Sequence, residues 1–244
     1  MRYLSKLKMF FSRLGLIAIS VSLAINMFSI FACANTNYLT NPDDDIYHNN
    51  ENEYMKIALT FDDGPHPRYT AQILDILEKY KIKATFFVIG INAKNYPDAM
   101  VNVIKHGHEI GNHTFSHPHV SCLNPSTLKN EVEQCETAIY ELTDHKTKLF
   151  RPPEGFIDAD VRTVLRDLDY KVILWDIDTR DWANTDPHDI SNYVIKNVTS
   201  GDIILMHDYI AHNSPTPEAL NLFVPVLLKK GYKFVVVSEL IGIK

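Results

Sequence analysis

The chain has 244 residues, the ordinary composition of a globular protein and a formal net charge of −6. This length suits one large domain or two small ones and is sufficient to bury a hydrophobic core. An acidic chain is poorly suited to phosphate contacts, which need clustered Lys and Arg, so its charge argues against nucleic acid as a partner.

The first 34 residues have the pattern of an export signal. An uncharged apolar stretch over residues 14–34 ends in Ala32-Cys33-Ala34 and follows four basic residues, Arg2, Lys6, Lys8 and Arg13. These features match a secretory signal with an A-x-A cleavage site. Two alternatives stay open: a retained membrane anchor, because the run approaches the length of a membrane span, and a lipid on Cys33. Each predicts an exported domain, extracellular or associated with the cell wall or membrane, that touches the membrane only through this segment.

Residues 35–53 are polar and rich in Asn and Asp, which predicts a flexible linker and leaves residues 54–244 as the folded domain. Removal of residues 1–34 takes away four positive charges and no negative ones, so the formal charge goes from −6 to −10. Such an acidic exported domain fits a neutral or amphoteric substrate, such as a cell-wall glycan.

From residue 55 onward, apolar runs typical of strands alternate with amphipathic helices. The expected strands cover residues 55–61, 84–90, 108–113, 148–150, 171–177, 202–206 and 233–240. The expected helices cover residues 70–80, the region of 100–104, 126–142, 159–168, 188–197 and 217–229. This alternation predicts an α/β fold with parallel strands and helical crossovers. About seven or eight such units indicate a small, incomplete (β/α) barrel.

Unusual polar residues follow the predicted strands directly. They are Asp62-Asp63, the pair His113 and His117, Arg151-Pro152-Pro153, the run from Asp178 to Trp182, and His207-Asp208. Each cluster alone has a structural interpretation, such as a turn for Asp-Gly-Pro or a capped helix start for "DTRDW". In a parallel barrel, however, the carboxyl ends of the strands form the catalytic rim. Their joint placement therefore indicates one functional site.

The residue types at this rim suit a hydrolytic metal site. Such a site needs about three protein ligands and open positions, and His113 and His117 offer two imidazoles. Either Asp62 or Asp63 supplies the carboxylate and leaves its neighbour as a general base, with His207 as the matching acid.

Other residues of the histidine-rich segment have different expectations. Glu109 is not the base of a zinc-protease motif, because "HEIGNH" lacks the H-E-x-x-H spacing. His106 and His108 precede the rim and are expected to be structural, whereas the role of His119 stays open. Cys135 continues a helical apolar pattern, so we expect Cys122 and Cys135 to be free thiols rather than a disulfide.

Five motifs of the chain, "TFDDGP", "HTFSH", "RPP", "DTRDW" and "LMHD", occur in this order. They resemble the motifs of the polysaccharide deacetylases of carbohydrate esterase family 4, the NodB homology domain. The resemblance covers about residues 55–240. It implies a distorted (β/α) barrel and a divalent metal, usually zinc with Co²⁺, Ni²⁺ or Mn²⁺ as alternatives, bound by Asp63, His113 and His117.

The same resemblance implies the catalytic roles. Asp62 is the general base, with Arg151 as its charge partner. His207 is the general acid, and Asp178 orients it. Asp181 belongs to a motif, but no chemistry is assigned to it.

The resemblance also implies the substrate pocket. Leu205 and Trp182 line the space for the acetyl methyl group, and a backbone amide at Glu154 stabilises the oxyanion. Here the chain departs from the family, which often has an aromatic residue at the position of Glu154. The backbone role is unaffected, but the side chain is expected to contact the substrate and adds negative charge near the groove.

Together these features predict a metal-dependent hydrolase that removes N-acetyl groups from N-acetylglucosamine units of a cell-wall glycan, most simply peptidoglycan. Chitooligosaccharide, exopolysaccharide and acetyl xylan are alternative substrates. A non-catalytic glycan-binding domain is a rival, but it would be expected to lose catalytic residues that this chain keeps. A histidine-rich metal-scavenging protein would need neither "RPP" nor "DTRDW". The oligomeric state is left open.

Overall fold

The computed structural model describes residues 46–50, 54–183, 185–209 and 213–243. All of them belong to one compact unit, Asp45–Lys244. The predicted signal segment and most of the predicted linker therefore lie outside the described residues. Within the described ranges, none of the helices combines the length and apolar character needed to cross a membrane.

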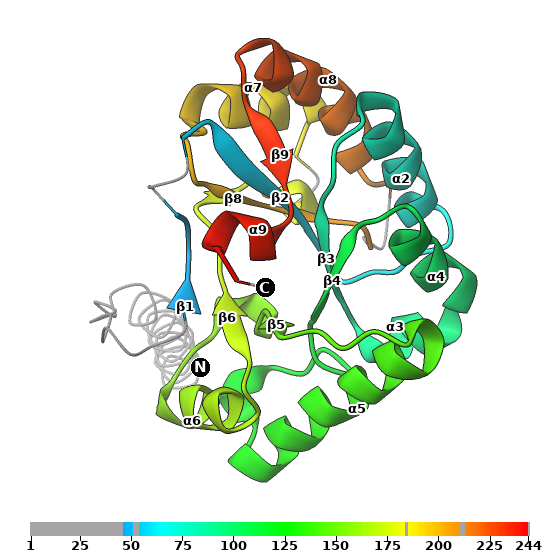
Figure 1. The fold of residues 1–244 in the computed structure, drawn as a ribbon, viewed down its shortest axis with the longest axis vertical. Coiled ribbons are helices and arrows are strands. Elements are labelled where there is room, and N and C mark those ends of the chain that lie inside the picture. Colours follow the sequence, from blue (N-terminus) through cyan, green and yellow to red (C-terminus); the bar gives the residue numbers. More distant parts are fainter. Residues whose placement is uncertain (1–45, 51–53, 184, 210–212, 244) are drawn as a thin grey trace, which may run out of the picture. The chain divides into compact units, whose positions relative to one another are not determined.

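Parallel strands alternate with helices along the described chain (Figure 1). The strands are β1 (Ile46–Tyr47), β2 (Lys56–Asp62), β3 (Thr85–Val88), β4 (Glu109–Asn112), β5 (Leu149–Phe150), β6 (Lys171–Ile173), β7 (Ile177–Asp178), β8 (Ile203–His207) and β9 (Lys233–Val235). The helices are α2 (Tyr69–Tyr80), α3 (Gly90–Asn95), α4 (Pro97–Lys105), α5 (Pro125–Thr143), α6 (Ala159–Asp167), α7 (Pro187–Asn197), α8 (Thr216–Lys229) and α9 (Val237–Ile241). Three short 3-10 helices are η1 (Val120–Cys122), η2 (Pro153–Gly155) and η3 (Asp181–Ala183).

The strands form one sheet in the order β1-β6-β5-β4-β3-β2-β8-β7, with β9 paired to β2. Every pairing between these named strands is parallel. The predicted strand 171–177 is split into β6 and β7, which lie near opposite ends of this order. Residues 174–176 thus connect a strand near one edge of the sheet to the strand at the opposite edge. This short connection is possible because the sheet curls into a half-barrel. When β6 and β7 are counted as one strand, the nine described strands of the sheet become eight, which agrees with the predicted seven or eight. The predicted distorted (β/α) barrel is confirmed.

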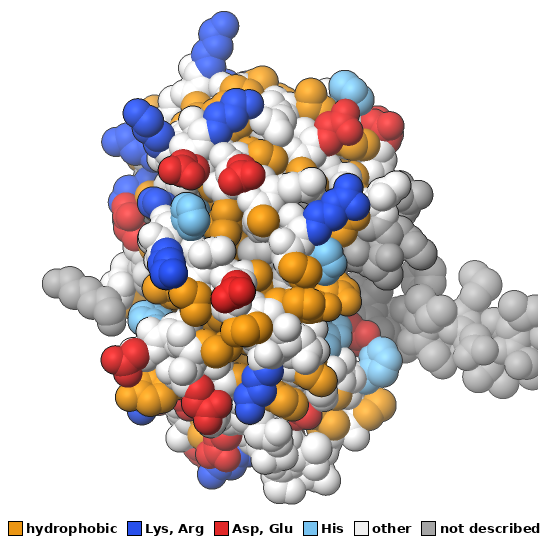
Figure 2. Space-filling view, turned by 90° about the vertical axis from the view of Figure 1, so that its right-hand side faces the viewer, with side chains coloured by type: hydrophobic (Ala, Val, Ile, Leu, Met, Phe, Trp, Pro, Cys, Tyr) orange, Lys and Arg blue, Asp and Glu red, His pale blue; other side chains and the backbone are white. Residues whose placement is uncertain are grey.

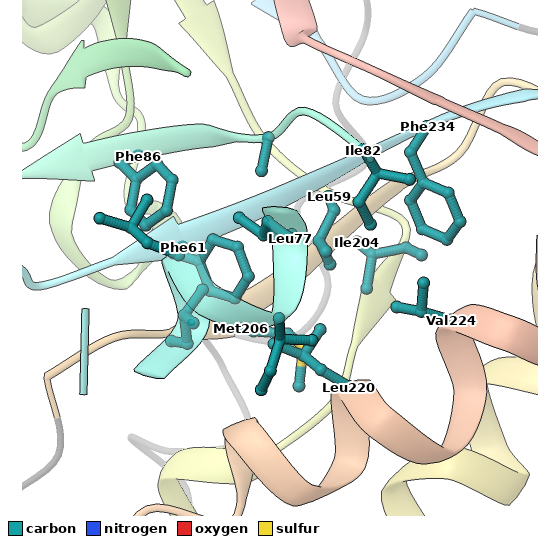
Figure 3. Close-up of a cluster of buried hydrophobic side chains, with 14 of the residues drawn as sticks. Leu59, Phe61, Leu77, Ile82, Phe86, Ile204, Met206, Leu220, Val224 and Phe234 are labelled. Atoms are coloured by element: carbon teal, nitrogen blue, oxygen red, sulfur yellow. The ribbon is translucent and has the colours of Figure 1, made fainter. Parts of the chain in front are cut away.

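Side chains alternate between the inside of the half-barrel and the layer beneath the helices, as expected for strands buried on both faces. The inner cluster combines side chains from several strands and α9: Ala58, Phe87, Leu149, Ile173, Ile203, Val235, Val237 and Leu240. Figure 3 shows the outer cluster, in which Phe61 of β2 and Phe86 of β3 pack with Leu77 of α2 and Leu220 of α8. Their apolar burial holds the strands in register, and this register sets the positions of the strand ends.

The last predicted strand, residues 233–240, is only partly correct. It ends at Val235, and the chain turns into α9, whose Val237 and Leu240 are fully buried in the inner cluster. The backbone amide of Val237 donates to Thr85 at the start of β3, and that of Ser238 donates to Glu109 at the start of β4. Helix α9 therefore covers the amino ends of these strands (Figure 1). The opposite, carboxyl ends are left open.

Residues 46–50 differ from the linker prediction. Ile46 and Tyr47 pair with β6, and the Asn50 side chain donates to the carbonyl of Leu240 at 2.8 Å. Asn49 forms an antiparallel bridge with Asp202. The packed domain consequently begins before residue 54, because two apolar side chains in a polar segment suffice to extend the sheet.

Three of the helices begin at side chains that cap them, in agreement with the predicted starts. Asn124, Asp158 and Asp186 accept backbone N–H groups of α5, α6 and α7 respectively. Such caps stabilise a helix by about 1 kcal/mol each. On the face shown in Figure 2, Lys and Arg side chains are interspersed with Asp and Glu, so this face does not present one continuous basic stripe.

Candidate active site

The polar clusters predicted at the strand ends meet in one open pocket of about 440 Å³, a size typical of ligand sites. Ten residues line it: Asp62, Asp63, His113, His117, Glu154, Trp175, Asp178, Trp182, Leu205 and His207. Asp62, Asp178 and His207 are the last residues of β2, β7 and β8. The predicted polar side chains thus meet at the carboxyl ends of the strands.

Asp63, His113 and His117 bring their ligand atoms within 4.8 Å of one another. One carboxylate oxygen of Asp63 lies 3.4 Å from Nε2 of His113 and 3.3 Å from Nε2 of His117. This oxygen, Oδ1, is buried and has no hydrogen-bond partner. An orphaned anionic oxygen between two imidazole nitrogens fits a divalent cation, which prefers this donor set. The three side chains predicted as ligands therefore lie together, as a metal site requires.

The environment of His113 prepares it for this role. Its Nδ1 donates to the carbonyl oxygen of Arg151 at 2.7 Å, so Nε2 is left free to face Asp63. Burial acts to lower the pKa of His113, but the carboxylates of Asp62 and Asp63 outweigh it and raise the pKa above its ordinary value. The site therefore favours a positive charge at this position.

The loop that carries His117 is held by a residue that sequence reasoning missed. Glu131 of α5 accepts the backbone N–H groups of Phe115 and Ser116 at 3.0 and 2.8 Å, and the Ser116 hydroxyl at 2.9 Å. The backbone of His117 is left-handed, with φ at 55°. Because a left-handed backbone is unfavourable for a residue other than glycine, the loop needs contacts such as those of Glu131 to hold it. The helical pattern of residues 126–142 placed Glu131 on a helix, but not beside this loop.

Asp62 and Arg151 form a buried ion pair in the half-barrel, as predicted. Nη1 of Arg151 lies 2.7 Å from Oδ1 of Asp62, and the guanidinium also donates to the carbonyls of Ile173 and Leu174. Arg151 is fully buried and lies over the Phe87 ring at 4.2 Å. Loss of one partner of such a pair costs about 3–5 kcal/mol because a charge is left uncompensated. The pair holds the Asp62 carboxylate in one orientation.

His207 is oriented by Asp181, which corrects the prediction of Asp178. Nδ1 of His207 lies 2.7 Å from Oδ1 of Asp181, and Oδ2 of Asp181 accepts the His207 backbone N–H at 2.8 Å. Oδ1 of Asp178 instead accepts the backbone N–H of Arg180. Burial acts to lower the pKa of His207, but Asp181, followed by Asp62 and Asp63, raises it to about 9. Without a metal ion, this environment therefore favours the imidazolium form of His207 at neutral pH.

The physical reason lies in the turn after β7. Arg180 has a positive φ of 54°, and η3 begins at the next residue. Asp181 is fully buried and also accepts the Thr216 hydroxyl at 2.6 Å. Asp178 is partly exposed at the pocket mouth.

The predicted pocket residues Leu205, Trp182 and Glu154 all line the pocket. Trp182 is 52% exposed, so its indole is open to a ligand. Glu154 pairs with Nδ1 of His119 at 2.8 Å, which gives His119 a place at the pocket mouth.

The remaining residues of the histidine-rich segment are structural. Nδ1 of His108 accepts the backbone N–H of Ala84, and His106 contacts the carbonyl of Asn102. Glu109 accepts the Thr85 hydroxyl at the closed end of the barrel. Cys122 and Cys135 are both free thiols, as predicted.

Asp208 is a further buried carboxylate beside the pocket. It accepts the Thr70 hydroxyl at 2.5 Å, while its Oδ1 has no partner. A Cβ on Gly64 would lie 2.1 Å from this carboxylate, so only glycine fits there. Burial, with the charges of Asp63 and Asp62, raises the pKa of Asp208 to about 7. The sequence motif contained Asp208 but did not indicate its burial.

Comparison with known proteins finds the polysaccharide deacetylase family, whose model matches residues 49–173. A peptidoglycan-N-acetylglucosamine deacetylase of Bacillus cereus is 44% identical over 190 residues, which cover 77% of this chain and 89% of that protein. A peptidoglycan-N-acetylmuramic acid deacetylase of Bacillus subtilis is 36% identical over 188 residues, 77% of this chain and 39% of that protein. The crystal structure of the Bc1960 peptidoglycan N-acetylglucosamine deacetylase is similar with a TM-score of 0.83 and 30% identity, over 86% of this chain and 99% of that one.

Proposed function

Because this chain belongs to the polysaccharide deacetylase family, we propose that it removes the N-acetyl group from N-acetylglucosamine units of peptidoglycan. One observation carries the proposal. The Asp62–Arg151 pair, the Asp63–His113–His117 cluster and the His207–Asp181 pair all face one pocket. The relatives named above supply the substrate class.

The chemistry requires a nucleophile, a place for the oxyanion and a proton for the leaving amine. A divalent cation bound by Asp63, His113 and His117 would polarise the acetamide carbonyl and make water more acidic. Asp62 accepts the proton of the attacking water, since the contact with Arg151 fixes its carboxylate at the pocket wall. The resemblance assigns oxyanion stabilisation to the backbone amide of Glu154, a residue that lines the same pocket.

His207 supplies the proton that the leaving amine needs. An amide anion is too basic to leave, so the nitrogen must be protonated as the C–N bond breaks. The His207 imidazolium, with its Nδ1 held by Asp181, presents Nε2 as the donor. Asp181 itself does not touch the substrate and acts as a positioning residue.

We further propose that zinc is the metal and that the domain works outside the cytoplasm. Two imidazoles with one carboxylate and open positions are a common catalytic zinc set. The basic and apolar pattern of residues 1–34 supports export. Retention of this segment as an anchor, or a lipid on Cys33, would keep the same domain at the membrane.

Acetate release tests the proposal on three substrates: peptidoglycan, chitin oligomers and acetylated xylan. We expect the purified, zinc-loaded full-length chain to act fastest on peptidoglycan, with a free amine on glucosamine in the product. A free amine on muramic acid would reassign the target sugar, and faster release from chitin oligomers or xylan would reassign the glycan. If no substrate releases acetate while binding to glycan persists, the domain is a non-catalytic glycan-binding module.

A further inference from the structure

The mouth of the pocket carries two carboxylates that the proposed reaction does not use. Four of the ten lining residues are acidic, and none of the lining residues in the described part of the chain is Lys or Arg. Asp62 is neutralised by Arg151, and Asp63 belongs to the metal ligands. Glu154 and Asp178 remain, so the charge they present to a ligand is negative.

Glu154 is placed by its backbone at a fixed point of this mouth. Its φ is 60°, and φ of the following Gly155 is 67°. A Cβ on Gly155 would meet the Trp175 ring at 2.8 Å, which shows that the turn packs closely on this indole. The backbone that carries Glu154 thus packs against an aromatic wall of the pocket.

The partner of Glu154 is easily displaced. The only ion pair found for it in the described residues is with His119, whose side chain is 75% exposed, while that of Glu154 is 53% exposed. Exposed pairs of this kind contribute little to stability. A cationic group of a ligand can therefore replace the imidazole at the carboxylate.

The surroundings of Glu154 match an amino sugar. Trp175 and Trp182 line the same pocket, and aromatic rings attract the apolar side of a sugar ring as well as a cation. A carboxylate in the same pocket accepts hydrogen bonds from an ammonium group more strongly than from a neutral amide. Deacetylation itself produces this ammonium group on glucosamine.

We propose that Glu154 is a specificity-determining residue, which makes the site prefer a glycan with a free ammonium group on the sugar next to the target. A neutral acetamide at that sugar is accepted less well, and a free carboxylate is disfavoured by repulsion from Glu154. The proposal rests on the proposed deacetylase function. On a glycan of consecutive N-acetylglucosamine units, such as chitin oligomers, it implies that each deacetylation favours the next one on the same chain.

Two chitin tetramers test this inference, one fully acetylated and one with a single free amine beside an acetylated unit. Acetate release by the zinc-loaded full-length protein gives kcat/KM for each, and their ratio is the readout. We expect Glu154→Gln to lower the ratio of free-amine to fully acetylated substrate about two- to fivefold, mainly through KM, as for a half-exposed ion pair. His119→Ala should raise the ratio, because it removes the competing imidazole. Glu133→Gln, an exposed carboxylate on α5, is the matched control.

The outcomes separate this inference from the proposed function. An unchanged ratio in Glu154→Gln overturns the inference, as does a shift in the same direction for both the Glu154 and the His119 variants. Loss of the preference in 0.5 M salt would support a charge effect, since screening weakens exposed pairs, at roughly a 4 Å Debye length. If the wild-type protein releases no acetate from either tetramer or from peptidoglycan, the deacetylase function itself is wrong.

Discussion

Asp181→Asn tests the assignment of the residue that orients the general acid. The Asp181 carboxylate lies 2.7 Å from Nδ1 of His207 and is the first of the groups that raise its pKa, against the opposing effect of burial. The pKa of His207 rises from 6.5 to about 9, and this difference corresponds to about 3 kcal/mol in favour of the imidazolium. Removal of a contacting negative charge lowers such a pKa by about 1–2 units.

The sign of the effect on activity follows from the role of His207. The acid must be protonated, so activity falls as pH rises through its pKa. A fall in that pKa from about 9 to about 7 reduces the protonated fraction at pH 8.5 roughly 25-fold. A cation at the metal ligands repels the imidazolium and lowers the pKa in both proteins, but the difference between them persists. The basic limb of the rate profile should thus move to lower pH by about 1–2 units.

The assay is kcat/KM for acetate release from a chitin tetramer between pH 5.5 and 10, with zinc content measured on the same samples. Asp178→Asn is the matched control, because Asp178 contacts the Arg180 backbone rather than His207. Thermal unfolding should show that Asp181→Asn lowers the free energy of unfolding by about 1–3 kcal/mol. The reason is that the amide NH₂ of Asn would face N–H and O–H donors whose hydrogen bonds Asp181 now accepts. The reasoning is refuted if the basic limb moves in Asp178→Asn and stays in place in Asp181→Asn.

Four further substitutions have distinct expected results. Asp62→Asn should retain zinc but lower the rate of acetate release about 10²-fold, whereas Asp63→Asn should lose both zinc and activity. Elemental analysis and acetate release check this, and exchanged results for the two variants would reverse the two assignments. Glu131→Gln should weaken zinc binding about tenfold in chelator competition because the His117 loop loses its clamp, and equal affinity to wild type would contradict this. The folded pKa of Asp208, about 7, lies above its ordinary value, so the metal-free wild type should lose stability relative to Asp208→Asn as pH rises from about 4 to 7. Urea unfolding of the two proteins with chelator at pH 5 and pH 8 measures this, and a difference independent of pH would show that Asp208 is not buried as a neutral acid.

The sequence by itself determined the order of strands and helices and the positions of the polar clusters. Both follow from local patterns, namely apolar periodicity and the residue types that interrupt it. Because parallel strands share the direction of their carboxyl ends, residues such as Asp62, His113 and His207 could be placed on one rim without coordinates. The motif resemblance then separated Asp63 as a ligand from Asp62 as a base, a choice that spacing alone left open.

Contacts between elements distant in the chain were decided only by the tertiary structure. Asp178 ends β7 and Asp181 lies three residues later, and no local pattern tells which one reaches His207. The answer depends on the register of β7 against β8, which pairs Asp178 with Leu205, and on the left-handed turn at Arg180 that buries Asp181. The clamp of the His117 loop by Glu131 and the closure of the barrel by α9 were likewise decided by packing between elements that are distant in the chain. Each depends on the direction of a side chain after packing, which the backbone path and the neighbouring elements set together.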